Sequence, residues 1–262
     1  MMTPDLLLQR AKTLKLHGLI NHWDEVVDAA WLEQLISWEE LYRSQKSLDS
    51  RLRSARLGRF KSLADFDWSW PKRCERDVIE EWMQLHFMKD ATNLILCGPN
   101  AVGKTTIARN IAYQAILKGH TALFTTAAGM LNELAAIDSD SALRRRIKSY
   151  VQPALLVIDE VGYLSYSNRH ADLLFEIISR RYEEKSTLIT TNKQFNEWRE
   201  IFPNAACVVS IIDRLVHHSE IVNIEAESFR LKEWKDNSAK KTAERSIKKN
   251  SVKTEEKKSC VT

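Results

Sequence analysis

Short apolar runs alternate with amphipathic segments over the second half of the chain. The segments at residues 105–119 and 172–184 have the periodicity of helices. Four apolar runs have the length of buried strands: residues 94–98 (LILCG), 121–126 (TALFTT), 155–160 (LLVIDE) and 187–192 (TLITTN). Because continuous apolar strands that alternate with helices form parallel sheets covered on both faces, this pattern predicts a three-layer α/β domain.

Three further segments complete the pattern. Residues 127–150 leave room for two helices, of which the second contains SALRRRIKSY. Residues 222–226 (VNIEA) predict a last strand. Beyond Trp234 the chain consists mainly of Lys, Ser, Glu and Thr, and it has almost nothing to bury, so we expect a disordered tail.

Residues 1–90 have a helical pattern throughout, in which leucines recur at three- and four-residue steps. Six of the eight tryptophans lie here, which favours a small helical domain that uses aromatic side chains as core and as a docking face. Residues 43–61 carry seven basic residues and one acid, Asp49. A solvated helix face explains this run, and a nucleic-acid contact is the alternative.

Composition and charge indicate a basic C-terminal segment and the compartment in which we expect the protein. The net charge of +4 conceals a local charge of +5 between Lys232 and Cys260, where ten Lys/Arg face five Asp/Glu. We predict three parts: a helical domain (1–90), a nucleotide-binding domain (91–235) and a basic tail (236–262). The four cysteines have no paired spacing, the first residues lack a signal-peptide apolar stretch, and no run is long enough to span a membrane. We therefore expect a cytoplasmic protein.

The sequence GPNAVGKT at residues 98–105 carries the clearest chemistry. It satisfies G-x-x-x-x-G-K-[ST] and stands between a predicted strand and a predicted helix. Its glycines let the backbone N–H groups approach phosphates, and the following helix adds its positive end. Lys104 would reach the β- and γ-phosphates, and the Thr105 hydroxyl would bind Mg²⁺. The predicted ATP-binding residues are Gly98, Pro99, Asn100, Ala101, Val102, Gly103, Lys104, Thr105 and Thr106.

Two acids end the third predicted strand. Asp159, at the carboxyl end of the strand, would hold Mg²⁺ together with Thr105. Glu160 would be the base that activates a water molecule, which favours hydrolysis over transfer to another acceptor.

Two more residues could complete a hydrolytic site. Asn192 ends the next strand, where it could orient the attacking water or simply cap the strand. Arg214 lies in a predicted helix beside Asp213. It could pair with that acid, or it could act as an arginine finger on the γ-phosphate bound by a neighbouring subunit.

The assembled motifs resemble those of the IstB-type ATPases, helper proteins of bacterial insertion sequences that are related to the DnaC helicase loaders and the DnaA initiators of the AAA+ group. The resemblance covers roughly residues 1–235. The phosphate loop and the acid pair are common to many ATPases, whereas three runs are more specific: SLADFDW (62–68), RRYEEKSTLITTN (180–192) and DRLVHHSE (213–220).

This resemblance implies an AAA+ domain without a helical lid and an ATPase that assembles on double-stranded DNA as a homo-oligomer and recruits or stimulates a transposase. It implies Asn192 as a sensor and Arg214 as the arginine finger. The helices at 127–150 correspond to an insertion that related proteins use near DNA. Candidate DNA contacts are therefore Arg144, Arg145, Arg146 and Lys148, for which a solvated helix face is the alternative. The role of Arg230 stays open.

Two other functions share parts of this pattern. A helicase loader would have the same ATPase site and a different partner. A small-molecule kinase would share the phosphate loop and the Mg²⁺ acid, but it needs an acceptor pocket and commonly a lid with arginines, for which the chain after Asn192 leaves little length.

Overall fold

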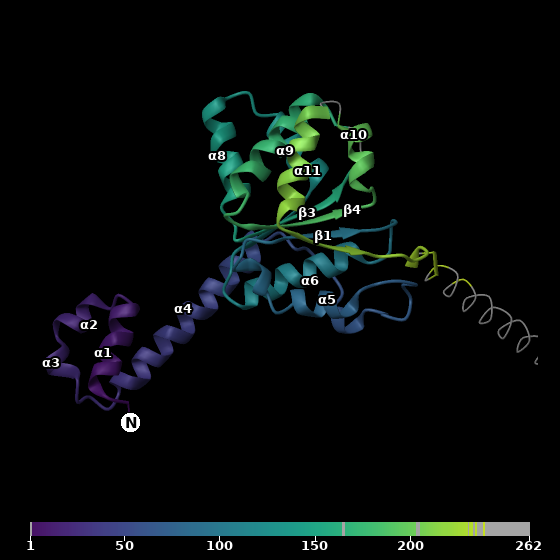
Figure 1. The fold of residues 1–262 in the computed structure, drawn as a ribbon. Helices are drawn as coiled ribbons and strands as arrows, with labels where there is room; N and C mark the ends of the chain where they lie inside the picture. Colours follow the sequence, from purple (N-terminus) through teal and green to yellow (C-terminus); the bar gives the residue numbers. More distant parts are fainter. Residues whose placement is uncertain are drawn as a thin grey trace, which may run out of the picture.

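A single parallel sheet organises the second half of the protein (Figure 1). The computed structural model describes residues 2–163, 166–202, 205–229, 231, 232, 234 and 238. Within them the strand order is β2-β3-β4-β1-β5. The strands are β1 (Asn93–Cys97), β2 (Ala122–Thr126), β3 (Leu155–Val161), β4 (Ser186–Thr191) and β5 (Ser219–Asn223). The predicted three-layer α/β fold is confirmed.

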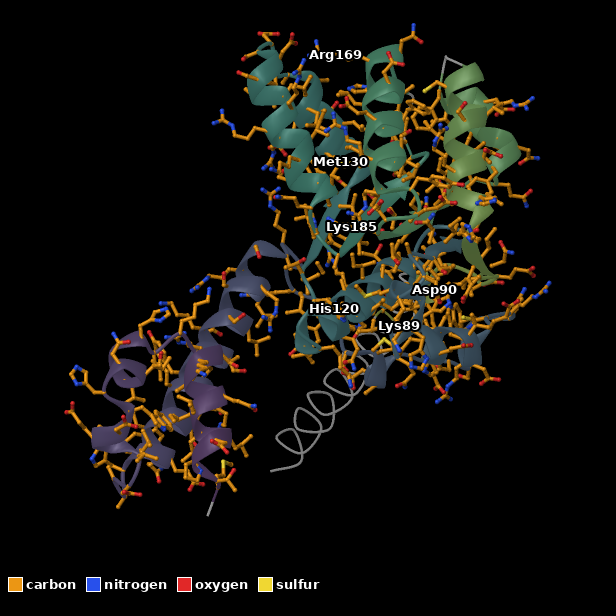
Figure 2. The ribbon with its side chains drawn as sticks, turned by 60° about the vertical axis from the view of Figure 1, so that its left-hand side comes forward. Lys89, Asp90, His120, Met130, Arg169 and Lys185 are labelled. Carbon is orange, nitrogen blue, oxygen red and sulfur yellow. The ribbon has the colours of Figure 1, made fainter. Side chains whose placement is uncertain are left out.

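Helices cover both faces of the sheet, and each face has its own apolar core. On one face, Met130, Ile158 and Leu215 belong to a cluster formed with the helices α7 (Ala127–Ala135), α8 (Asp140–Val151), α9 (Asn168–Arg181), α10 (Trp198–Ile201) and α11 (Ala205–His217). On the other face, Ile111 and Val157 belong to a cluster formed with α5 (Arg76–Trp82) and α6 (Lys104–Leu117). Figure 2 shows Met130 among the packed side chains of the first face. Residues 127–150 form two helices, as predicted.

The first helices form a separate small core. Leu7, Ala11 and Ile36 belong to a buried cluster shared by four helices: α1 (Pro4–Thr13), α2 (His17–Asn21), α3 (Trp23–Val26) and the start of α4 (Leu32–Ser54). The middle of α4 is exposed and leads to the sheet, where Ala55 and Leu57 join the second core (Figure 1). A domain boundary near residue 90 stays a prediction, and the packing groups residues 55–91 with the sheet.

Residues 56–75 depart from the helical pattern predicted for 1–90. They contain a short 3₁₀ turn, η1 (Leu63–Asp65), and otherwise run without regular structure. The chain leaves the helix at Arg56 and Gly58, which both have left-handed backbone angles. The Asn110 side chain on α6 then holds the segment, because its amide bonds the backbone of residues 61 and 63 at 3.0 Å each. Tertiary contacts therefore override the periodicity of this stretch.

The remaining boundaries differ little from the prediction. Strand β5 begins three residues before the predicted strand, because Ser219 already pairs with Asn93 of β1. Short 3₁₀ helices lie at η2 (His86–Met88) and η3 (Phe195–Glu197). Arg230 and, apart from residue 238, the predicted basic tail lie outside the described residues. In the part of the chain that the structure describes, no helix combines the length and apolar character that crossing a membrane requires.

Arg181 at the end of α9 is a buried cation that joins several elements. Its guanidinium donates hydrogen bonds to six oxygen atoms, those of Thr187 Oγ1 and of the carbonyls of residues 150, 151, 153, 154 and 186. Two of these carbonyls belong to the last turn of α8, where a positive charge is favourable. Burial lowers the pKa of Arg181 to about 9, so the group keeps its charge at neutral pH.

We expect Arg181→Met to lower the free energy of unfolding by at least about 3 kcal/mol, because it leaves several buried carbonyls without donors. The neighbouring Arg180 is exposed and pairs with Glu176 one turn away, so Arg180→Met should change it by no more than about 0.5 kcal/mol. Urea unfolding of both variants measures the difference. Equal losses would show that the buried hydrogen bonds of Arg181 do not stabilise the fold.

Candidate functional site

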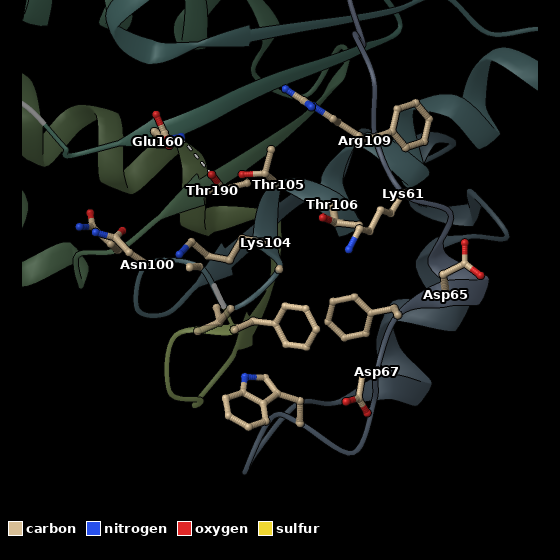
Figure 3. Close-up of a pocket in the computed structure, with 18 of the residues that line it drawn as sticks. Lys61, Asp65, Asp67, Asn100, Lys104, Thr105, Thr106, Arg109, Glu160 and Thr190 are labelled. Atoms are coloured by element: carbon tan, nitrogen blue, oxygen red, sulfur yellow. Dashed lines mark hydrogen bonds between the residues drawn. The ribbon is translucent and has the colours of Figure 1, made fainter. Parts of the chain in front are cut away.

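A pocket of about 440 Å³ lies at the carboxyl edge of the sheet (Figure 3). The loop between β1 and α6 and the ends of β3 and β4 form one side, and residues 59–70 form the other. In Figure 3, Lys104 and Glu160 lie on the first side, and Lys61 and Asp65 lie on the second. The volume falls in the range of small-molecule sites. The structure therefore places the predicted phosphate loop in a pocket large enough for a ligand.

The loop of residues 98–103 has a backbone that its two glycines permit. Gly103 has a φ of +103°, and a Cβ at this position would overlap the Phe66 ring. A Cβ on Gly98 would collide with the carbonyl oxygen of Ile224. The helix α6 begins immediately after Gly103, so its free N–H groups face the loop. This is a geometry that can hold an anion.

Lys104 lies inside this loop. Its side chain is largely buried, and its Nζ donates to the carbonyl oxygens of Gly98 and Pro99 at 2.6 Å each. Burial lowers the pKa of Lys104, while the nearby Cys97, Asp159 and Glu160 act in the opposite direction. Phosphate oxygens would stabilise the charged form that burial disfavours.

The side chains of Thr105 and Asp159 meet as the sequence predicts. The Thr105 hydroxyl lies 3.0 and 3.1 Å from the two carboxylate oxygens of the buried Asp159. The Thr190 hydroxyl on β4 donates to the same carboxylate and accepts a hydrogen bond of 2.9 Å from the backbone N–H of Glu160. A hydroxyl beside a fixed carboxylate is a pair of oxygen ligands suited to Mg²⁺.

Glu160 lies near the end of β3, and Asn192 comes directly after the adjacent strand β4. Both residues line the pocket. Glu160 is exposed and has a left-handed φ of +61°, so its carboxylate leaves the strand at the pocket. The Asn192 Oδ1 atom is buried and has no hydrogen-bond partner among the described residues. A buried polar atom without a partner carries a free-energy cost, which a bound water or ligand would relieve.

Arg214 does not line the pocket of its own chain. It lies in α11, half-buried, where Nη1 donates to the carbonyl of Ser210 at 3.0 Å and the guanidinium stacks 4.8 Å from the centre of the Phe175 ring. Among the described residues, no ion pair with Asp213 is formed. Pairing with Asp213 therefore does not account for Arg214 among the described residues, and its role as an arginine finger stays a prediction.

The four basic candidates on α8 have different environments. Arg144, Arg145 and Lys148 are exposed. Arg146 instead forms an ion pair of 2.6 Å with Glu133 on α7 and stacks over the Tyr150 ring. Three of the four side chains are therefore available to a ligand, whereas Arg146 joins two helices.

Sequence patterns predict little of the opposite wall of the pocket. Phe60, Phe66, Trp70 and Phe229 line it with apolar rings. The chain near residue 229 is held there by distant contacts: the N–H of Phe229 donates to Ala101 O at 3.0 Å, and the indole of Trp70 donates to the carbonyl of residue 227 at 3.0 Å. An ion pair of 3.1 Å joins Lys232 to Asp67. The specific run at 62–68 was the one signal for this wall.

The match to known proteins covers most of the chain. The family described as IstB-like ATP binding protein matches residues 9–237. The chain belongs to this family. It is 34% identical over 238 residues to the ATP-binding protein assigned to insertion sequence IS21 of Pseudomonas aeruginosa, covering 87% of this chain and 89% of that protein. It is also 34% identical to the corresponding protein of IS5376 of Geobacillus stearothermophilus, covering 78% and 81% of the two chains.

Solved structures confirm the fold of this IstB-like protein. The crystal structure of DnaI superposes with a TM-score of 0.54 at 20% identity, covering 62% of this chain and 90% of that one. A replication initiator DnaA bound to AMPPCP and single-stranded DNA superposes with a TM-score of 0.53 at 18% identity, covering 63% and 50%. The predicted α/β P-loop fold is therefore confirmed.

We expect Thr190→Val to keep the fold and to damage the site. Loss of the Thr190 hydroxyl leaves the N–H of Glu160 without an acceptor and removes one hydrogen bond from the Asp159 carboxylate. The free energy of unfolding should therefore fall by about 1–3 kcal/mol. Misplacement of the acids should slow ATP turnover by about 100-fold. Thr125→Val, on the edge strand β2 and away from the pocket, is the control. Unchanged turnover in Thr190→Val would exclude a positioning role for its hydroxyl.

Proposed function

We propose that this IstB-like protein hydrolyses ATP in the pocket at the carboxyl edge of the sheet and acts as a DNA-bound helper of transposition. The observation that carries the proposal is the meeting of Lys104, Thr105, Asp159, Glu160 and Asn192 around one pocket. The relatives in insertion sequences support the biological setting.

The residues present fit ATP and Mg²⁺. The glycine loop has no room for a Cβ at Gly98 or Gly103, and the Lys104 ammonium lies within it. The aromatic wall of residues 60, 66, 70 and 229 offers an apolar surface for a base. Thr105 and Asp159 would hold Mg²⁺, which neutralises charge on the β- and γ-phosphates when it is bound.

The hydrolytic chemistry lies with the residues at the ends of β3 and β4. The exposed carboxylate of Glu160 accepts a proton from a water molecule in the pocket. The Asn192 side chain lines the same pocket and orients this water, for which its Oδ1, without a hydrogen-bond partner among the described residues, turns towards the pocket. Lys104 stabilises the negative charge of the phosphoryl oxygens.

Arg214 completes this site from a second copy of the chain. It lies outside the pocket of its own chain, and its partners there are a backbone carbonyl and a ring, so no carboxylate in the described part of the chain pairs with it. An arginine supplied by a neighbour makes hydrolysis depend on assembly. ATP then serves as a removable link between subunits of an oligomer.

Double-stranded DNA and a transposase are the partners of this assembly. Arg144, Arg145 and Lys148 are exposed on one helix and can contact phosphates without reading bases. The insertion-sequence relatives favour the transposase of the same element over a replicative helicase. Pull-down of a helicase instead of the transposase would replace this partner with the one that a helicase loader needs.

We expect purified protein to release phosphate from ATP with no added acceptor, because water is the acceptor. The specific activity should rise with protein concentration and with added duplex DNA, since both favour assembly. Phosphate release measured over a protein dilution series, with and without DNA, checks this. A requirement for a small-molecule acceptor would instead indicate a kinase, and a flat response to both variables would contradict the assembly step.

We expect Glu160→Gln and Arg214→Ala each to bind ATP and to lose turnover. A mixture of the two should recover part of the activity, because Arg214→Ala supplies an intact Glu160 and Glu160→Gln supplies an intact Arg214. Phosphate release from the mixture, compared with each variant alone, measures this recovery. A mixture as inactive as its components would exclude an arginine supplied in trans, and loss of ATP binding in Arg214→Ala would indicate a folding defect.

A further inference from the structure

Three potential metal ligands gather at the edge of the sheet opposite the pocket. Glu183 lies in the turn between α9 and β4, and His217 and His218 lie at the end of α11. The Glu183 carboxylate is 3.8 Å from His217 Nδ1 and 3.6 Å from His218 Nε2. All three ligand atoms lie within 4.8 Å of one another, and all three side chains are exposed.

The fold itself brings these residues together. In a parallel sheet all strands begin at one edge, so the turns that precede β4 and β5 end near each other. His218 is fixed there because its carbonyl accepts a hydrogen bond of 2.8 Å from the N–H of Asn93, the first residue of β1. Figure 2 labels Lys185 and Asp90, which precede β4 and β1 and mark this edge.

We propose that Glu183, His217 and His218 form a binding site for one divalent transition-metal ion of the Zn²⁺ class. Two imidazoles and one carboxylate are a ligand set that Zn²⁺ accepts, with a fourth position left for water. When nitrogen and oxygen ligands lie about 2.0 Å from a tetrahedral Zn²⁺ ion, the ligand atoms are roughly 3.3 Å apart. The separations of 3.6 and 3.8 Å from the Glu183 carboxylate are slightly wider, and the two histidine nitrogens lie within 4.8 Å of each other, so the exposed side chains must rotate to close around an ion.

A neighbouring hydroxyl competes for one of the three ligand atoms. The Tyr182 hydroxyl lies 2.9 Å from His217 Nδ1, so an ion must displace this hydrogen bond to bind that nitrogen. On metal binding, Nδ1 releases the tyrosine, whose hydroxyl can then bond a water in the fourth position. The rings of His217 and His218 pack edge to face with centroids 4.3 Å apart, which keeps both imidazoles on the same side.

The site is separate from the nucleotide pocket. None of its three residues lines that pocket, and the length of a strand separates the two edges of the sheet, about 16 Å for five residues. A bound ion would tie the last turn of α11 to the turn after α9. Because Arg214 precedes His217 by one turn, the ion would also limit the motion of the helix that carries this arginine.

We expect chelator-treated protein without a histidine tag to bind one Co²⁺ or Zn²⁺ per chain. Co²⁺ should give the visible absorption of a four-coordinate site with nitrogen and oxygen ligands, without a band from a cysteine thiolate. Calorimetric titration with Zn²⁺ alone, in the absence of nucleotide, measures affinity and stoichiometry. The variant His217→Ala/His218→Ala should lose this binding, and Glu183→Gln should weaken it about 10–100-fold.

His22→Ala is the matched control, because His22 is also exposed and pairs with a glutamate, Glu25, at 2.9 Å, but the described residues offer no third ligand there. It should keep full Zn²⁺ affinity. Unchanged stoichiometry in the double histidine variant, or no binding by the unmodified protein, would overturn the proposal. If the double variant fails to fold, anomalous scattering from Zn²⁺ in crystals of the unmodified protein decides: a peak between Glu183 and His217 supports the site, and a peak elsewhere overturns it.

Discussion

The hydroxyl of Thr190 is the contact on which the geometry of the nucleotide pocket depends. Strand β4 lies between β1, which leads into the phosphate loop, and β3, which carries the acids. The Asp159 carboxylate and the backbone of Glu160 both bond this one hydroxyl, and Thr105 bonds the same carboxylate from the start of α6. Three elements from separate parts of the chain are thereby held in register around one buried side chain. Because β4 lies between β1 and β3, it is the strand that can contact both the phosphate loop and the acid pair.

Much of this arrangement follows from local sequence. The apolar runs fix the five strands, and the glycine loop and the acid pair fix where phosphate and Mg²⁺ would bind, because both depend on residue types at short spacing. Thr190 was not predicted, since a threonine within a strand carries no signal until its neighbours are known. The environments of Arg146 and Arg181 were equally hidden, because Glu133 and the carbonyls at the end of α8 reach them only through packing.

The wall formed by residues 59–70 shows the same limit in another form. Its periodicity predicts a helix, but contacts with Asn110 and with the loop of residues 98–103 hold it against α6 without α-helical structure. We call residues 59–70 the strap. Long-range contacts override the helical periodicity here. The segment forms hydrogen bonds to Asn110 and buries apolar side chains against the domain, and an isolated helix would have neither. Arg214 is the opposite case: its sequence position predicts an arginine finger, but it lies outside the pocket of its own chain, so this role stays a prediction.

The strap across the pocket has a consequence for biosynthesis. Asp67 pairs with Lys232, and Arg73 exchanges backbone hydrogen bonds with Glu225, so segments that precede and follow the sheet meet beside the same pocket. During translation the phosphate loop leaves the ribosome more than a hundred residues before its last wall. At about 5–20 residues per second, the emerging chain spends several seconds between synthesis of the loop and synthesis of this wall. A nascent chain therefore acquires its complete nucleotide site only after residues 225–232 have been made.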